Sequence, residues 1–106
     1  MAWLFLILAG SLEIVWAFAM KQSQGFTRLT PTLVMAVAMI GSIVLLASAM
    51  RTLPLGTAYT VWTGIGAVGS FVIGIVALGE EASLMRVSAA ALIVAGLILM
   101  KLSTNA

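Results

Sequence analysis

The sequence predicts an all-α membrane protein with four transmembrane helices in each subunit. Of the 106 residues, 63% are hydrophobic and only 8% are charged, whereas soluble domains carry about a quarter charged residues. The mean hydropathy is +1.25. Uncharged stretches of roughly 20 residues, long enough to cross a bilayer, alternate with short polar breaks. We therefore expect the lipid bilayer to surround this chain.

The first helix is expected over residues 1–20, which contain a single charged residue, Glu13, and end at the polar residues 21–25. Ala17 and Ala19 resemble a signal-peptide cleavage site, but no basic residue precedes the apolar stretch and an acid lies inside it. We expect this segment to remain as a membrane span.

The second helix is expected over residues 31–50, because Thr30 suits an N-cap and Pro31 suits the first helical position. No further charge appears until Arg51. The third helix is expected over residues 56–78, another uncharged stretch. Both segments are long enough to span the membrane.

The fourth helix is expected over residues 83–101, with Ser83 as its cap, and it is the shortest apolar run. We interpret Glu80 and Glu81 before it as solvated loop residues without a ligand role, favourably placed ahead of a helix start. Residues 1–106 are thus expected to form a single four-helix transmembrane domain.

Composition excludes several functions. The chain has no Cys and no His, so disulfides, thiolate or imidazole metal sites, Cys nucleophiles and His bases are absent. We expect no enzyme activity, no metal and no cofactor. The net charge of +2 is too small for a nucleic-acid footprint, so no nucleic acid is expected as a partner.

Basic residues are nearly balanced between the two membrane faces. An even number of spans places Arg51 and Lys101 on the face of the termini, and Lys21, Arg28 and Arg86 on the other. The positive-inside rule then barely selects an orientation. We expect copies to insert both ways and to pair as an antiparallel homodimer, because four helices enclose too little space to surround a hydrated cavity.

Two stripes of small residues are candidates for a close helix interface. Gly66, Ser70 and Gly74 recur at four-residue spacing on the third helix, and Ala91 and Ala95 on the fourth. Either stripe suits dimer contact or packing within one copy, and the spacing does not distinguish these roles.

Glu13 is the strongest candidate for ligand binding. A carboxylate at the centre of a membrane helix costs roughly 3 kcal/mol on insertion scales, so such residues usually have a function. Loss of water favours the protonated form of a carboxyl group, which would let Glu13 exchange a proton for a cation. The alternative is a permanently protonated packing residue.

Three residues are candidate neighbours of Glu13. Gly10 and Trp16 lie three residues before and after it on one helical face, where Gly10 leaves space and Trp16 offers a flat wall with one N–H donor. An interfacial role for Trp16 is an equal alternative. Ser42 is a candidate donor to Glu13, although serine more often bonds to its own helix.

The third helix carries two aromatic residues and a hydroxyl on one face, Tyr59, Trp62 and Thr63, close to Gly66. Aromatic faces attract cations, and the Tyr O–H and Trp N–H are hydrogen-bond donors; the alternative is an aromatic belt at the membrane surface. Gly64, Gly66 and Gly69 match the spacing of a dinucleotide fingerprint, but the preceding strand and the later acidic residue that it requires are missing. We therefore interpret these glycines as packing or hinge positions.

These residues together resemble the small multidrug resistance family. The resemblance rests on residues 13–17 (Glu-Ile-Val-Trp-Ala), on Lys21, and on residues 53–66 (Leu-Pro-Leu-Gly-Thr-Ala-Tyr-Thr-Val-Trp-Thr-Gly-Ile-Gly). The guanidinium exporter branch is the most similar, because polyaromatic-cation exporters usually carry glycine at the position of Trp16, and Thr57 and Thr63 suit the exporter pattern.

The resemblance implies a proton-coupled exporter of guanidinium, with small substituted guanidines as further candidates, in the bacterial inner membrane. It implies an antiparallel homodimer that works by alternating access, with Glu13 of both copies as the shared site for substrate and protons. By position, Trp16, Ser42, Tyr59 and Trp62 would line this site, with Ser42 and Trp62 orienting Glu13 through hydrogen bonds.

Three alternatives remain at this stage. The first is a multidrug exporter of quaternary ammonium or polyaromatic cations. The second is a dual-topology ion channel, although a carboxylate at mid-membrane repels anions. The third is a structural membrane subunit that needs a different partner chain, in which Glu13 would only pack.

Overall fold

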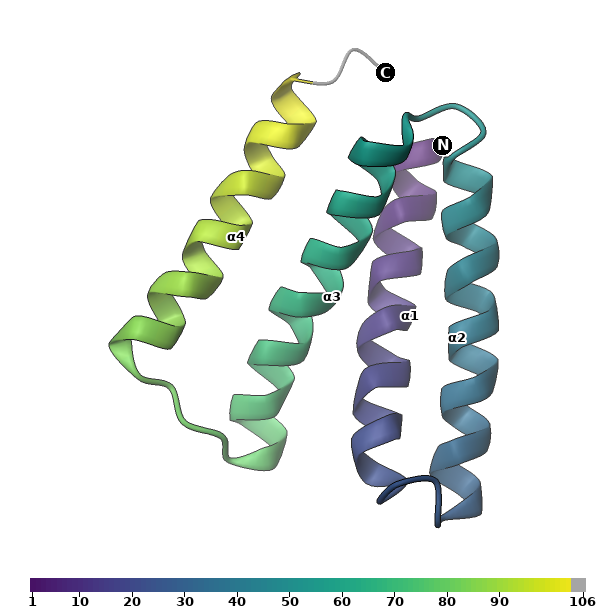
Figure 1. Ribbon diagram of the computed structural model, residues 1–106, viewed down its shortest axis with the longest axis vertical. Helices are drawn as coiled ribbons and strands as arrows, with labels where there is room; N and C mark the ends of the chain where they lie inside the picture. Colours follow the sequence, from purple (N-terminus) through teal and green to yellow (C-terminus); the bar gives the residue numbers. More distant parts are fainter. Residues whose placement is uncertain (104–106) are drawn as a thin grey trace.

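The computed structural model describes residues 1–103, which form four helices and no strand. Each helix is long and apolar enough to cross a membrane, so the predicted all-α architecture is confirmed. The helix limits differ from the expected ones by about one or two residues, no more than the variation between methods of helix assignment. The helices are α1 (Ala2–Gln22), α2 (Leu29–Ala49), α3 (Leu55–Leu78) and α4 (Leu84–Ser103) (Figure 1).

Helix α2 begins earlier than its sequence suggested. Arg28 is the N-cap, with an extended backbone at φ −106° and ψ 123°, and Leu29 and Thr30 are already helical. The prediction of Thr30 as the cap is therefore wrong. Pro31 lies within the first turn, where a missing N–H removes no helical hydrogen bond. The Thr32 hydroxyl donates to the Arg28 carbonyl at 2.6 Å.

The turn between α3 and α4 follows from its sequence. Gly79 ends α3 in the left-handed conformation, at φ 69°, which glycine adopts without a steric penalty. The N–H of Glu80 then donates to the carbonyl of Gly74 at 3.0 Å. At the start of α4, the N–H of Arg86 donates to the Ser83 hydroxyl at 3.2 Å, so the predicted cap is confirmed.

Helix α1 lies between α2 and α3, whereas α4 leans away from the other three (Figure 1). The backbone of helix α4 lies close only to that of α3, and none of its residues is buried. Most of its apolar side chains are exposed; Leu92 is 74% exposed and Leu102 is 76% exposed. The buried core lies instead where α1, α2 and α3 meet; its residues are Leu6, Ala9, Leu46, Ala49, Leu53, Ala58 and Val61.

The start of α1 and the end of α4 lie at the same end of the bundle (Figure 1). There the Lys101 ammonium lies 4.6 Å from the centre of the Trp3 ring, a cation–π contact. The α1–α2 and α3–α4 connections lie at the opposite end, here called the loop end. Lys21, Arg28 and Arg86 therefore lie at the loop end, and Arg51 and Lys101 lie at the opposite end, as expected from the sequence.

Candidate functional site

Glu13 lies near the middle of α1 and contacts the backbone of α3. A Cβ atom at Gly66 would overlap the Glu13 carboxyl group, so only glycine allows this close approach. The Oε1 atom of Glu13 is buried and has no hydrogen-bond partner within residues 1–103. A buried polar atom without a partner costs about 1–3 kcal/mol. The carboxyl group is thus placed to take a proton, a ligand or another chain as its partner.

Trp16 and Gly10 flank Glu13 on α1 in different ways. The indole Nε1 of Trp16 is also buried without a hydrogen-bond partner in the described part of the chain. Gly10 does not leave open space beside the carboxyl group as the sequence suggested. A Cβ there would come within 2.5 Å of Ile65 on α3. The space beside Gly10 is therefore filled by the Ile65 side chain.

Ser42 and Trp62 form a hydrogen-bonded link between three helices. Ser42 of α2 is fully buried, and its hydroxyl donates to the Ala9 carbonyl of α1 at 2.6 Å. The indole Nε1 of Trp62 on α3 donates to the same hydroxyl oxygen at 2.9 Å. The only proton of each donor is therefore used. The link holds α1, α2 and α3 in register beside the Glu13 site.

The link differs from two expectations. The resemblance implied that Ser42 and Trp62 donate to Glu13, but in this structure they bond to Ala9 and to each other. The Ser42 hydroxyl does not bond back to its own helix either. The missed partner is a backbone carbonyl, which no residue type reveals in the sequence.

Replacing Ser42 by Ala should destabilise the protein by about 1–3 kcal/mol, because the buried Trp62 N–H and Ala9 carbonyl lose their partner. Ser48→Ala is the matched control on α2, since the Ser48 hydroxyl bonds only to the Val44 carbonyl of its own helix, at 2.9 Å. We expect it to change stability by less than about 0.5 kcal/mol. Unfolding in detergent measures both; equal effects would contradict a special role for the buried link.

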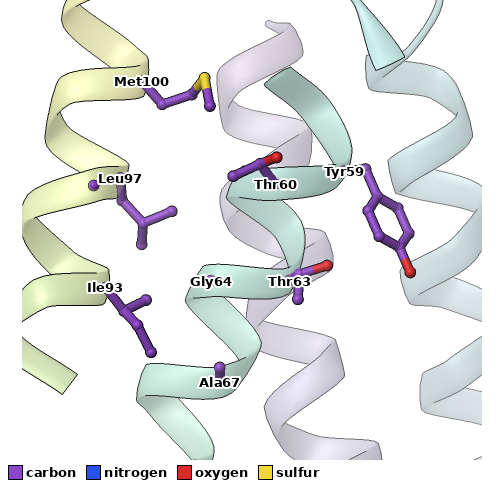
Figure 2. A pocket seen from close by; sticks show the side chains of 9 residues that line it. Tyr59, Thr60, Thr63, Gly64, Ala67, Ile93, Leu97 and Met100 are labelled. Atoms are coloured by element: carbon purple, nitrogen blue, oxygen red, sulfur yellow. The ribbon is translucent and has the colours of Figure 1, made fainter. Parts of the chain in front are cut away.

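Tyr59 and Thr63 of α3 are not part of the hydrogen-bonded link formed by Ser42 and Trp62. The rings of Tyr59 and Trp62 are 5.5 Å apart at an angle of 46°, but Tyr59 is 53% exposed. Tyr59 and Thr63 both line a cavity of about 530 Å³ between α3 and α4 (Figure 2). Leu97 reaches into it from α4 and contacts Gly64, where a Cβ would come within 2.5 Å. Gly64 is thus a contact point between α3 and α4.

The two stripes of small residues differ in burial. Gly66 and Gly74 are buried, and a Cβ on either would overlap a carboxyl group of the same chain. The α3 stripe therefore packs within one copy. Ala91 and Ala95 on α4 remain exposed, so the α4 stripe is the one left accessible to lipid or to another chain.

Comparison with known proteins agrees with this architecture. The sequence model of the family described as Small Multidrug Resistance protein matches residues 1–93. The chain belongs to the small multidrug resistance family. Curated relatives share its length as well as its sequence: the proteins named guanidinium exporter from Yersinia pseudotuberculosis and Escherichia coli K12 are each 57% identical to it. The match covers 98% and 99% of the chain, respectively, and 100% of both relatives.

A guanidinium exporter from Salmonella typhimurium is 58% identical over 105 residues. These members of the small multidrug resistance family are named for export, so the chain is a member of a transporter family and not an enzyme. Its four apolar helices make it a multi-pass membrane protein, and these relatives are bacterial.

Proposed function

We propose that the protein is a proton-coupled exporter of guanidinium. The observation that carries this proposal is the buried Oε1 of Glu13, which lacks a hydrogen-bond partner within residues 1–103. Guanidinium is planar, permanently charged near neutral pH, and binds a carboxylate through two parallel N–H donors. The names of the relatives point to the same cation.

The proposed unit is an antiparallel homodimer with Glu13 of both copies at one site. The position of Glu13 supports this arrangement, because α1 covers Ala2–Gln22 and Glu13 lies about one residue, or about 1.5 Å along the axis, from its midpoint. Turning a copy over in the membrane therefore leaves the carboxylate at nearly the same depth. The exposed apolar face of α4 offers a surface for the second copy.

Coupling in this dimer requires no second site. Protons and guanidinium compete for the same two carboxylates. When either of them is bound, the site can switch from opening on one side of the membrane to opening on the other. A proton gradient then drives guanidinium outward. The Ser42–Trp62 link would hold α1 and α3 together during this change.

Competition predicts a defined pH dependence. With purified protein in liposomes, the KM of the guanidinium-evoked current should fall as pH rises, because fewer protons occupy Glu13. The fall should be at most about tenfold per pH unit for each competing proton. A KM that does not change with pH would contradict shared binding, and flux that ignores protons altogether would indicate a channel.

The same assay separates the substrate classes. Trp16 lies on the Glu13 face of α1 with its indole N–H buried, so little room is expected for a bulky aromatic cation. We expect current with guanidinium and little with a bulky quaternary ammonium ion. The reverse result would assign the protein to multidrug export. No current with either cation would favour a structural subunit.

A further inference from the structure

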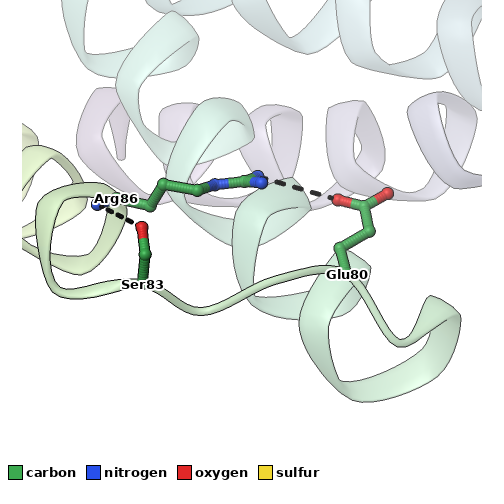
Figure 3. Close-up of polar contacts among 3 residues, drawn as sticks. All are labelled: Glu80, Ser83 and Arg86. Atoms are coloured by element: carbon green, nitrogen blue, oxygen red, sulfur yellow. Dashed lines mark hydrogen bonds and ion pairs between the residues drawn. The ribbon is translucent and has the colours of Figure 1, made fainter.

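The loop between α3 and α4 holds a second carboxylate beside a guanidinium group, outside the Glu13 site. The Oε1 atom of Glu80 lies 4.0 Å from an amino nitrogen of Arg86 (Figure 3), and the two side chains are 42% and 46% exposed. An ion pair this long and this exposed is weak. Arg86 therefore holds Glu80 loosely, and its guanidinium group also lies 5.5 Å from the centre of the Phe71 ring on α3, which it can keep when the ion pair breaks.

Glu80 does not extend freely into solvent. Its backbone N–H donates to the Gly74 carbonyl at 3.0 Å, and a Cβ on Gly74 would overlap its carboxyl group. Both ends of the residue are thus held against the last turns of α3. This contact fixes the carboxylate at the loop end of the groove between α1 and α3.

A cavity of about 130 Å³ opens beside this carboxylate, several times the roughly 30 Å³ that one water molecule occupies in the liquid. A cation with four heavy atoms therefore fits. Glu80 and Ser70 line the cavity from the α3 side, and Ile14 lines it from α1. Ile14 follows Glu13 directly, and Ser70 lies one turn beyond Gly66, on which Glu13 rests. The cavity thus lies in the groove between the two carboxylates.

We propose that the Glu80 carboxylate is a second binding position for the transported guanidinium cation, at the loop end of the α1–α3 groove, and that the cation in this cavity competes with Arg86 of α4, which pairs with the same carboxylate. This inference rests on the guanidinium export proposed above. Free guanidinium presents the same planar donors as an arginine side chain. Exchange therefore replaces one guanidinium group by another at the carboxylate, and the displaced Arg86 side chain, already 46% exposed, turns toward solvent. Lys21, which lines the same cavity, repels either cation.

The exchange predicts opposite effects of two substitutions. Glu80→Gln removes the binding position and should raise the KM for guanidinium. Arg86→Gln removes the competitor and should lower it. A purely structural ion pair predicts the same effect from both, because either change breaks the same contact. The helix cap is kept in Arg86→Gln, since the Ser83 hydroxyl accepts from the backbone N–H.

The experiment measures guanidinium-evoked current in liposomes at equal amounts of reconstituted full-length protein. We expect KM to change by about two- to fivefold in each direction, as suits a half-exposed pair, with little change in maximal current. The double variant should match Glu80→Gln, because without the binding position the competitor has no effect. Glu81→Gln is the control, since Glu81 is exposed and adjacent in the same loop.

Three results would overturn this inference while guanidinium export stands: a higher KM in both single variants, unchanged KM in both, or an equal effect from Glu81→Gln. Wild-type protein without any guanidinium current would instead remove the proposed function, and this inference with it. The wild-type signal therefore separates the two failures.

Discussion

Glu13→Gln should reduce the guanidinium-evoked current by at least about a hundredfold. A carboxylate binds guanidinium through two charge-assisted hydrogen bonds of about 1.5–3 kcal/mol each, and every 1.4 kcal/mol is a factor of ten. Glutamine keeps the shape of the side chain but loses the charge and cannot bind a transported proton. Substrate binding and proton coupling should disappear together.

The same substitution should not weaken the fold. Oε1 of Glu13 has no hydrogen-bond partner among residues 1–103, so no such bond is lost, and the cost of a carboxylate within the membrane is removed. We expect an unfolding temperature in detergent equal to or above that of wild type. Transport that survives in Glu13→Gln would assign this residue to packing and would contradict its role as the shared site for guanidinium and protons.

Gly66→Ala is the second substitution with a large expected effect. The new Cβ would overlap the Glu13 carboxyl group, so either the carboxylate must move or α1 and α3 must separate. Overpacking of this kind costs about 1–3 kcal/mol, which corresponds to roughly five- to 150-fold. We expect guanidinium-evoked current to fall by at least about fivefold, measured at a guanidinium concentration below KM.

Gly56→Ala is the matched control on the same helix. Nothing lies within 4 Å of a Cβ built at Gly56, and the change from glycine to alanine is the same. Transport by this variant should equal that of wild type. If both variants transport normally, the carboxylate does not need to rest on α3, and the site must be formed differently.

The sequence was a good guide to features that depend on neighbouring residues. The four spans were predicted because hydropathy sums along the chain. The Ser83 cap was predicted because its partner is three residues away. Glu13 was predicted as a binding residue for the same reason, because a single acid inside an apolar run can be recognised from the neighbouring residues alone.

Features that depend on how the helices are placed were harder to predict. The Ser42 hydroxyl bonds to a carbonyl 33 residues earlier in the chain, and Gly10 receives Ile65 from a different helix. Glu80 was interpreted as a solvated loop acid, but the loop folds it back onto Gly74. None of these contacts leaves a pattern in residue spacing.

The sequence by itself determined that this chain is a four-helix membrane protein of the small multidrug resistance type, with one acid at mid-membrane. The tertiary structure alone decided which groups meet that acid and which are used in other contacts. The physical reason is that transfer of apolar segments into a bilayer is a local property of each segment. The partner of a polar group depends instead on the rotation and depth of each helix, which close packing between helices sets.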